Sequence, residues 1–116
     1  GVLPGGREAE TRYKIIKNYE LRIKNGKQEF SLLELFPKTG RTHQIRVHLK
    51  SIGHPIVGDE FYAGRKTARN DRKWCPRLFL HARSISFNHP KTREKMVIDA
   101  DLPGDLTNVL ATLDSD

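Results

Sequence analysis

The sequence predicts a mixed α+β fold with a mainly antiparallel sheet and two short helices. Two stretches have the pattern of a strand pair joined by a turn, and each precedes an amphipathic stretch of helical period. This order, two strands and a helix repeated once, is typical of helices packed on an antiparallel sheet. The chain has 116 residues, which suits one small domain. We therefore expect residues 1–116 to form a single domain.

The first strand pair is predicted between residues 12 and 36. Apolar and β-branched residues partly alternate in Arg12–Ile23, which favours a strand. Asn25-Gly26 is a typical turn pair between two strands. The returning segment Phe30–Phe36 is apolar on both faces, so we expect this second strand to lie deep in a sheet.

The segment Thr42–Gly53 predicts the first helix, with Thr42 as N-cap and Gly53 just beyond its end. Three aliphatic side chains recur at helical spacing and share one face: Ile45, Leu49 and Ile52. Three basic side chains occupy the neighbouring sector: His43, Arg46 and Lys50. The helix is therefore expected to have an apolar anchor face beside a basic face.

The second half of the chain predicts a loop, a hairpin and a helix. Ala63–Pro76 is polar and basic without any period, as in a long surface loop. Strands are expected at Leu78–His89 and Lys95–Ala100, joined by a turn at His89–Thr92. Four apolar residues at helical spacing then predict a short helix with Asp101 or Asp105 near its start: Leu106, Val109, Leu110 and Leu113.

Charge and composition restrict the class of protein. The net charge is +7 and the basic residues gather in the middle of the chain, so an anionic partner is indicated, most commonly nucleic acid; solubility alone is the other explanation. No apolar run reaches the roughly 20 residues of a membrane span, and the first ten residues lack the pattern of a signal peptide. The single cysteine, Cys75, suits a reducing, cytoplasmic compartment, and its simplest role is a buried filler.

The spacing of reactive side chains predicts neither a metal site nor a complete catalytic constellation. His43 and His48 are five residues apart, about 140° around a helix, which is wrong for joint ligation. His48 is better explained as a packed, hydrogen-bonded residue. No Gly-x-Ser-x-Gly motif or phosphate-binding glycine loop is present.

The basic face of the first helix is the remaining candidate site. Its side chains are of the kinds that bind phosphates and base edges: Arg41, Thr42, His43, Gln44, Arg46 and Lys50. Two interpretations remain open from the residues alone, namely a nucleic-acid-binding module and an ordinary solvated helix.

Four blocks resemble the RluA-type family of RNA pseudouridine synthases, in the same order and at similar spacing. They are TGRTHQIRVHL (residues 39–49), GHPIVGDEFY (53–62), RLFLHARSISFNHP (77–90) and DLPGDL (101–106). The upstream REAETRYKIIKNYE resembles the strand that precedes these blocks in that family. The resemblance covers nearly the whole chain and implies the pseudouridine synthase fold.

The resemblance also implies an activity and site residues. The family isomerises uridine to pseudouridine in structured RNA without metal or cofactor, and ribosomal RNA is the expected substrate. An aspartate is catalytic, and Arg46 is expected to pair with it. Ile45 is expected to line the base pocket, while Arg41, Thr42, His43 and Gln44 are expected to bind the RNA. The target uridine is expected to leave its stack.

The chain departs from the family pattern at one important point. The His-Arg-Leu-Asp segment that carries the catalytic aspartate is absent, and Asp59 matches a different family position. We therefore expect the C-terminal half of a catalytic domain, inactive by itself, whose partners are RNA and the missing N-terminal half. Two alternatives remain open: a non-catalytic RNA-binding module and a protein-interaction fragment. Arg65–Arg77 is a second candidate RNA contact, with Trp74 as either a stacking residue or an anchor for the loop.

Overall fold

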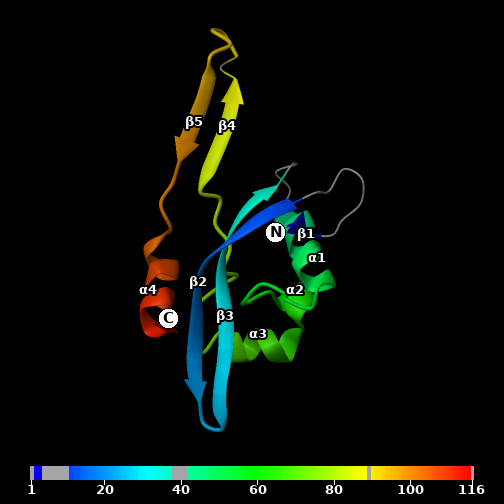
Figure 1. The fold of residues 1–116 in the computed structure, drawn as a ribbon, viewed down its shortest axis with the longest axis vertical. Coiled ribbons are helices and arrows are strands. Elements are labelled where there is room, and N and C mark those ends of the chain that lie inside the picture. Colours follow the sequence, from blue (N-terminus) through cyan, green and yellow to red (C-terminus); the bar gives the residue numbers. More distant parts are fainter. Residues whose placement is uncertain (1, 4–10, 38–41, 89, 116) are drawn as a thin grey trace.

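The computed structural model describes residues 2–3, 11–37, 42–88 and 90–115 of the chain. Its elements form two antiparallel sheets and, in this described part, four helices (Figure 1). The first sheet contains β1 (Val2–Leu3), β2 (Thr11–Ile23), β3 (Gly26–Pro37) and β6 (Asp114–Ser115). The second contains β4 (Ser84–Asn88) and β5 (Lys95–Asp99). The helices are α1 (Thr42–Ser51), α2 (Glu60–Ala63), α3 (Arg65–Asp71) and α4 (Gly104–Thr112). The predicted α+β class and antiparallel pairing are confirmed, but two helices had not been expected.

The β2–β3 hairpin is the longest feature of the fold. Its turn residues are Lys24 and Asn25, one position earlier than predicted, because Gly26 with φ 145° already pairs with Ile23. The expectation that the second strand lies deep in a sheet is wrong. The strand order β1-β2-β3 leaves β3 at the edge among the described strands, and Phe36 is 53% exposed. The apolar residues on both faces of β3 are therefore not all covered by the described residues.

Helix α1 packs its apolar face against the hairpin, as its periodicity predicts. Ile45 and Leu49 are buried and contact four partly buried residues: Tyr13, Leu33, Leu35 and Ile56. His48 is buried as expected, although its Nδ1 has no hydrogen-bond partner among the described residues. Ile52 lies beyond the helix and is 38% exposed, because the chain turns at Gly53, whose N–H donates to the Lys50 carbonyl at 2.9 Å. The helix already includes Thr42, so its N-cap falls outside the described residues.

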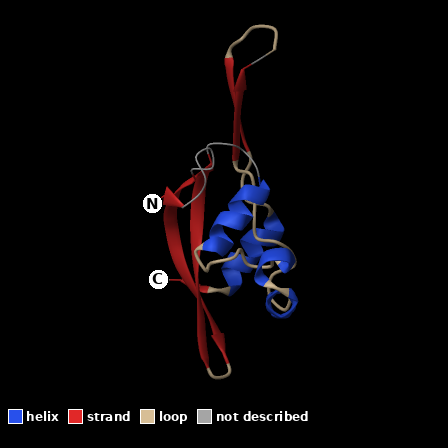
Figure 2. Cartoon of the chain, turned by 90° about the vertical axis from the view of Figure 1, so that its right-hand side faces the viewer, coloured by secondary structure: helices blue, strands red, loops and turns tan. Residues whose placement is uncertain are grey.

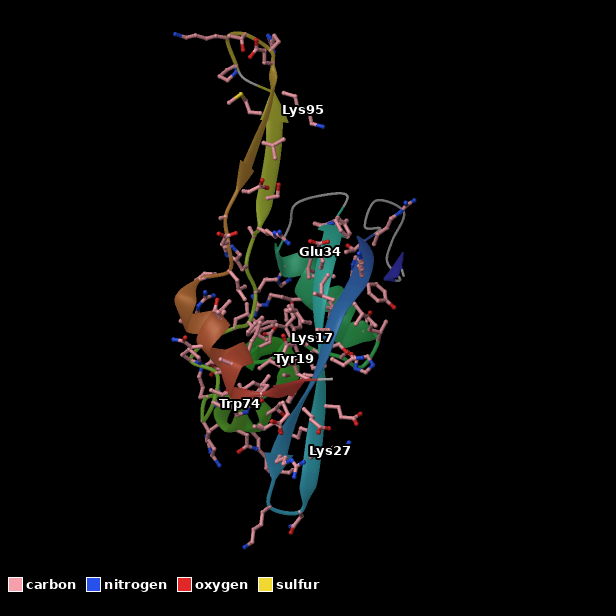
Figure 3. The ribbon with its side chains drawn as sticks, turned by 60° about the vertical axis from the view of Figure 1, so that its left-hand side comes forward. Lys17, Tyr19, Lys27, Glu34, Trp74 and Lys95 are labelled. Carbon is pink, nitrogen blue, oxygen red and sulfur yellow. The ribbon has the colours of Figure 1, made fainter. Side chains whose placement is uncertain are left out.

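Helix α3 lies in the middle of the predicted surface loop at Ala63–Pro76, and α2 ends at its first residue, so the prediction of a loop without helix is wrong. Asp59 caps α2 by accepting a hydrogen bond from the Tyr62 N–H at 3.1 Å. Gly64, with φ 91°, separates the two helices, and α3 then buries Ala68. Trp74 follows α3 (Figure 3) and packs on Phe30 of β3, and the ring centroids lie 5.0 Å apart. This contact is that of an anchor rather than of a free stacking residue.

The last third of the chain returns to the hairpin. The strand predicted at Leu78–His89 is shorter, because regular pairing in the described residues begins only at Ser84. The β4–β5 hairpin extends away from the body (Figure 1), and the Ala100 N–H bonds the Arg83 carbonyl at its base. Helix α4 has Asp105, not Asp101, in its first turn and buries Leu106 and Val109.

The helices gather on one face of the β2–β3 hairpin (Figure 2). Phe36 alternates with Leu33 and Leu35, which contact α1, so it belongs to the opposite face. No helix in the described part of the chain is long and apolar enough to cross a membrane. The fold thus has one covered and one largely uncovered sheet face, and α1 and α2 meet on the covered side.

Candidate active site

Arg46 and Asp59 form the central ion pair of the site. Arg46 lies on α1, beside the buried Ile45, and Asp59 lies just before α2. Arg46 Nε donates to Asp59 Oδ2 at 2.9 Å, and Nη2 donates to Oδ1 at 2.8 Å. This is the bidentate geometry that a planar guanidinium and a carboxylate favour. The pair fixes α1 against α2.

Hydrogen bonds from Arg46 keep the buried Asp59 carboxylate charged. Its side chain is fully buried, whereas that of Arg46 is 24% exposed. The hydrogen bonds from Arg46 hold the pKa of Asp59 below its ordinary range, against the opposite effect of burial. The same bonds raise the pKa of Arg46. With Oδ1 also accepting from the Tyr62 N–H, Asp59 has no exposed oxygen with which to act as a base or nucleophile.

Tyr62 and His43 extend the cluster around Arg46. The Tyr62 hydroxyl lies 2.7 Å from His43 Nε2, and the Tyr62 ring centre lies 5.2 Å from Arg46 Cζ. His43 and Arg46 are three residues apart on α1, and Asp59 and Tyr62 are three residues apart at the start of α2. Because side chains at this spacing share a helix face, two contacts form between the same two elements. A cation above a tyrosine ring adds a further attraction.

Helix α3 and its C-cap residue Arg72 fix the backbone next to Asp59. Gly58 donates its N–H to the buried Asp71 at 2.8 Å and accepts from Arg72 Nη2 at 3.1 Å. Its φ is 79°, and a Cβ at this position would lie 2.6 Å from both Arg72 Nη1 and the Arg77 carbonyl oxygen. Only glycine fits this conformation and this close approach. The position of Asp59 therefore depends on α3 as well as on Arg46.

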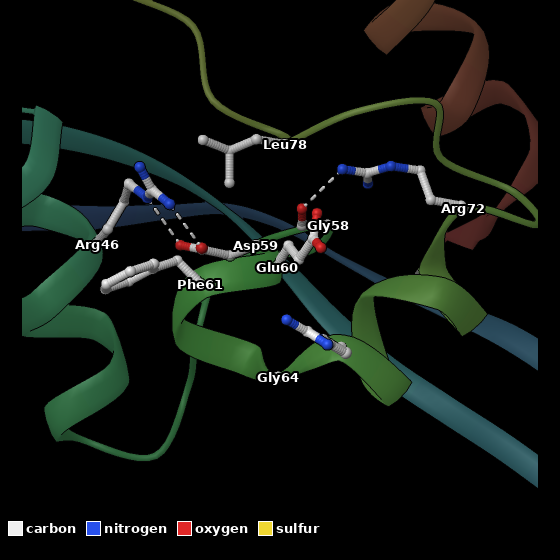
Figure 4. A pocket seen from close by; sticks show the side chains of 9 residues that line it. Arg46, Gly58, Asp59, Glu60, Phe61, Gly64, Arg72 and Leu78 are labelled. Carbon is white, nitrogen blue, oxygen red and sulfur yellow. Dashed lines mark hydrogen bonds and ion pairs between the residues drawn. The ribbon is translucent and has the colours of Figure 1, made fainter.

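A pocket of about 650 Å³ opens beside the ion pair (Figure 4). Arg46 and Asp59 form one part of its wall, and Phe61, Arg65, Arg72 and Leu78 form others. The pocket thus combines guanidinium groups with apolar surface, which suits a planar, partly anionic ligand such as a nucleotide. Across the described part of the chain, no three side chains of His, Cys, Asp or Glu lie close enough to share a metal ion.

The predicted site residues divide between this pocket and other places. Arg46 lines the pocket, and His43 contacts Tyr62, which lies beside Arg46. Ile45 lies in the core instead, only 8% exposed. Gln44 is half-buried on α1, Arg41 lies outside the described residues, and the side chain of Thr42 is not described.

Sequence reasoning missed Phe61 in the pocket wall and Tyr62 beside Arg46. Tyr62 had a usable signal, because it stands in GDEFY three residues after Asp59. Phe61 had none, since its role depends on a short helix with no clear periodicity. Arg72 falls within Arg65–Arg77, the predicted second RNA contact, but its place in this pocket was not expected. Asp59 had been noted only as a non-catalytic family position, and its pairing with Arg46 was not expected.

Comparisons with known proteins identify a family model, similar sequences and a similar fold. A family model described as RNA pseudouridylate synthase matches residues 3–51, which include β2, β3 and α1. A solved structure described as human RNA pseudouridylate synthase domain containing 1 is 30% identical, with a TM-score of 0.64. The match covers 93% of this chain and 40% of that one.

Bacterial relatives are more similar in sequence. An uncharacterized RNA pseudouridine synthase of Bacillus subtilis, YhcT, is 42% identical over 96% of this chain. The ribosomal large subunit pseudouridine synthase C of Vibrio parahaemolyticus is 42% identical over 97%. A tRNA pseudouridine synthase C of Haemophilus ducreyi is 42% identical, and the match covers 80% of this chain and 40% of that protein. The chain spans about a third (33%) of the first two relatives.

Proposed function

We propose that this chain, which belongs to the RluA-type family of RNA pseudouridine synthases, forms the C-terminal part of a catalytic domain that isomerises uridine in structured RNA. In this reaction the bond from ribose C1′ to uracil N1 breaks, and a bond from C1′ to C5 forms. The C5 hydrogen passes to water and N1 gains a proton, so atoms balance without an oxidant or reductant. The Arg46–Asp59 pair on the pocket wall carries the proposal.

Arg46 is suited to hold a second carboxylate. Asp59 takes up Nε and Nη2, while Nη1 donates to no acceptor among the described residues, and the side chain remains 24% exposed. A guanidinium fixed on one side by a buried carboxylate keeps its remaining donors in a defined direction. We assign to Arg46 the role of orienting the catalytic aspartate and of keeping it ionised.

Asp59 is not that catalytic aspartate. Its oxygens already accept three hydrogen bonds, two from Arg46 and one from Tyr62, and its side chain is fully buried. A carboxylate so engaged cannot reach a ribose or a uracil. We therefore infer that the catalytic aspartate is supplied by another part of the domain and that this chain is inactive alone.

The RNA-binding residues of the first helix remain part of the proposal. His43 is exposed at the N-terminal end of the described helix, where Arg41, Thr42 and Gln44 are its sequence neighbours. Ile45 is 8% exposed, so it can contact a base only through the edge of its side chain at the margin of the core. We assign these residues to binding the RNA around the target uridine.

Exposed apolar side chains of the hairpin support docking of the rest of the domain. Phe36 on the uncovered face is 53% exposed, and Ile15 and Ile16 beside the register shift in β2 are 52% and 50% exposed. Small soluble domains seldom leave so much apolar surface in contact with water. The relatives are about three times as long as the matching region, so they contain additional chain that can cover such a surface.

A tritium-release assay on RNA labelled at uridine C5 tests the proposal. Isomerisation replaces the C5 hydrogen, so turnover appears as tritium in water. We expect no release by this chain alone, and release when it is joined to the remainder of the catalytic domain taken from the Bacillus subtilis relative. Release by the chain alone would show that a residue within it is catalytic and would disprove the assigned roles.

The RNA class is tested in the same assay. One relative named for the ribosomal large subunit and one named for tRNA are equally identical to this chain, at 42%. We propose ribosomal RNA as the substrate, so large-subunit RNA should release more tritium than a tRNA pool. If the joined protein binds RNA but releases no tritium from either, a non-catalytic RNA-binding module is the better description.

A further inference from the structure

Three arginines follow one face of α3 and its end. Arg65, Arg69 and Arg72 are spaced i, i+4 and i+7, which places them within about 60° of arc around a helix. Ala68 and Asp71 are buried and lie about 70° and 130° around the helix from the middle of this arc. Arg65 and Arg69 are exposed on the arginine side, while the Arg72 guanidinium bonds a backbone carbonyl of the loop before α2.

The arginine face opens onto the pocket that contains Arg46. A second hollow of about 160 Å³ is lined by all three arginines, Ala68 and Glu60. It shares Glu60, Arg65 and Arg72 with the larger pocket. The two hollows adjoin at these residues and together form a groove from the Arg46–Asp59 pair to α3. Figure 4 shows the part of the groove beside the ion pair. We call it the α3 groove.

The charge of the α3 groove is positive and largely uncompensated. Arg46 is neutralised by Asp59, and Glu60 is the one acidic side chain that lines the described groove besides Asp59. Within the part of the chain that the structure describes, neither Arg65 nor Arg69 has an ion-pair or hydrogen-bond partner. Arg72 uses Nη2 to hold the Gly58 carbonyl. Unpaired guanidinium groups on neighbouring helical turns are well suited to successive phosphates.

Phe61 adds an exposed aromatic ring to the same groove. Its side chain is 76% exposed, the highest value among the large apolar residues described. Yet the ring is not unsupported, because it packs edge-on against Tyr62 with centroids 4.9 Å apart. Tyr62 is in turn held by His43 and Arg46. An exposed ring with a fixed edge offers a face on which a nucleic-acid base can stack.

We propose that the α3 groove is a subsite for single-stranded RNA next to the target uridine, in which a base stacks on Phe61 and phosphates bind Arg65 and Arg69. An acidic protein would also meet the positive charge, but it would leave the exposed ring of Phe61 without a planar partner. The subsite rests on the proposed function, because the nucleotides in the groove are positioned relative to a target uridine beside Arg46. It adds a binding surface outside the first helix and names the residues that carry it.

Salt-dependent RNA binding tests the phosphate contacts. The affinity of the chain for a short fluorescein-labelled single-stranded RNA is measured by anisotropy at several salt concentrations. Each phosphate contact to a single strand contributes about 0.7 to the slope of log affinity against log salt. We expect Arg65→Gln combined with Arg69→Gln to lower that slope by about 1.4. A matched variant, Lys24→Gln with Lys95→Gln, removes the same charge far from the groove and should leave the slope nearly unchanged.

Substitutions of Phe61 test the stacking contact. We expect Phe61→Leu to weaken binding about fivefold or more without changing the salt slope, and Phe61→Trp to retain affinity. Because Phe61 is exposed, neither variant opens the core, and circular dichroism should confirm an unchanged fold. Equal effects of leucine and tryptophan would overturn the stacking role, and equal displacement of the RNA by polyglutamate would point to an acidic protein instead.

The outcomes separate this subsite from the proposed activity. Equal loss of affinity in the arginine and lysine variants, or no RNA binding by the unsubstituted chain, would overturn the α3 groove as an RNA site. The tritium assay on the joined protein is independent of these results. Tritium release without any groove effect would retain the synthase and reject the subsite. Groove effects without tritium release would retain the subsite as an RNA contact and reject the activity.

Discussion

Arg46 and Asp59, thirteen residues apart in the sequence, are joined by two hydrogen bonds of 2.9 and 2.8 Å. The pair links the basic face of α1 to the loop that α3 holds through Gly58. Its carboxylate is fully buried while its guanidinium still reaches the pocket. Asp59 is thus a positioning residue for Arg46, and the predictions below separate the contribution of each member of the pair.

The first prediction concerns Arg46 in the proposed synthase, in which this chain is joined to the remainder of the catalytic domain. Arg46→Ala should abolish tritium release while RNA affinity falls only modestly, because one cation among many is lost. Arg46→Lys keeps the charge but loses the bidentate geometry, so it should also be severely impaired. Turnover and RNA anisotropy are measured on the same preparations. An Arg46→Ala enzyme with ordinary turnover would remove Arg46 from the catalytic role.

The second prediction concerns the stability that Asp59 contributes. Asp59→Asn keeps a side chain that can cap α2 but loses the charge that pairs with Arg46. We expect it to lower the free energy of unfolding by about 2 kcal/mol, the range for a hydrogen bond to a charged group. Urea denaturation measures the change. Asp105→Asn is the matched control, because Asp105 also pairs with an arginine, Arg77, but on the exposed surface. Its effect should be far smaller.

The third prediction is the pH dependence of the same contribution. The pKa of Asp59 is lower in the folded protein than in the unfolded chain, so its contribution is complete above the unfolded value of about 4. It is lost as the pH falls through the lower, folded value. The stability difference between the unsubstituted chain and Asp59→Asn should therefore be constant from neutral pH to about pH 5 and shrink in more acidic solution. A difference that grows on acidification would contradict the assigned pairing.

The fourth prediction separates close packing from backbone strain at Gly58. Gly58→Ala places a Cβ 2.6 Å from Arg72 Nη1 and from the Arg77 carbonyl oxygen, at a φ of 79°. Gly53→Ala is the control, because its φ is 81° but nothing lies within 4 Å of the added Cβ. We expect Gly53→Ala to cost about 1 kcal/mol of strain and Gly58→Ala at least about 2 kcal/mol more. If both variants lose the same free energy of unfolding in urea denaturation, the close packing of Arg72 and Arg77 against Gly58 does not contribute to stability.

Local patterns explain which elements could be predicted. The period of Ile45 and Leu49 predicts both helix α1 and the face it buries, and the buried position of His48 follows from the same count. The two hairpins follow from alternation and from their turn residues. In each case the signal lies within a few neighbouring residues, because helical and strand periods are set by backbone geometry.

The short helices were missed because tertiary contacts form them. α2 has four residues and α3 has seven, lengths at which an isolated helix is unstable in water. They persist because Asp59 caps α2, Ala68 is buried and Asp71 binds the Gly58 N–H. The apolar pattern of β3 led to the wrong prediction of a central strand. A strand with two apolar faces can also lie at the edge of a sheet, and the described residues do not cover this edge.

The sequence by itself determined the α+β class, the amphipathic helix α1, the basic centre of the chain and the likeness to RNA pseudouridine synthases. These features depend on periodicity and on blocks of adjacent residues. Only the tertiary structure decided that Asp59 holds Arg46, that Trp74 anchors on Phe30, and that Phe61 and three arginines share one groove. The physical reason is that these contacts join segments far apart in the chain, and their partners are selected by burial and charge geometry rather than by local spacing.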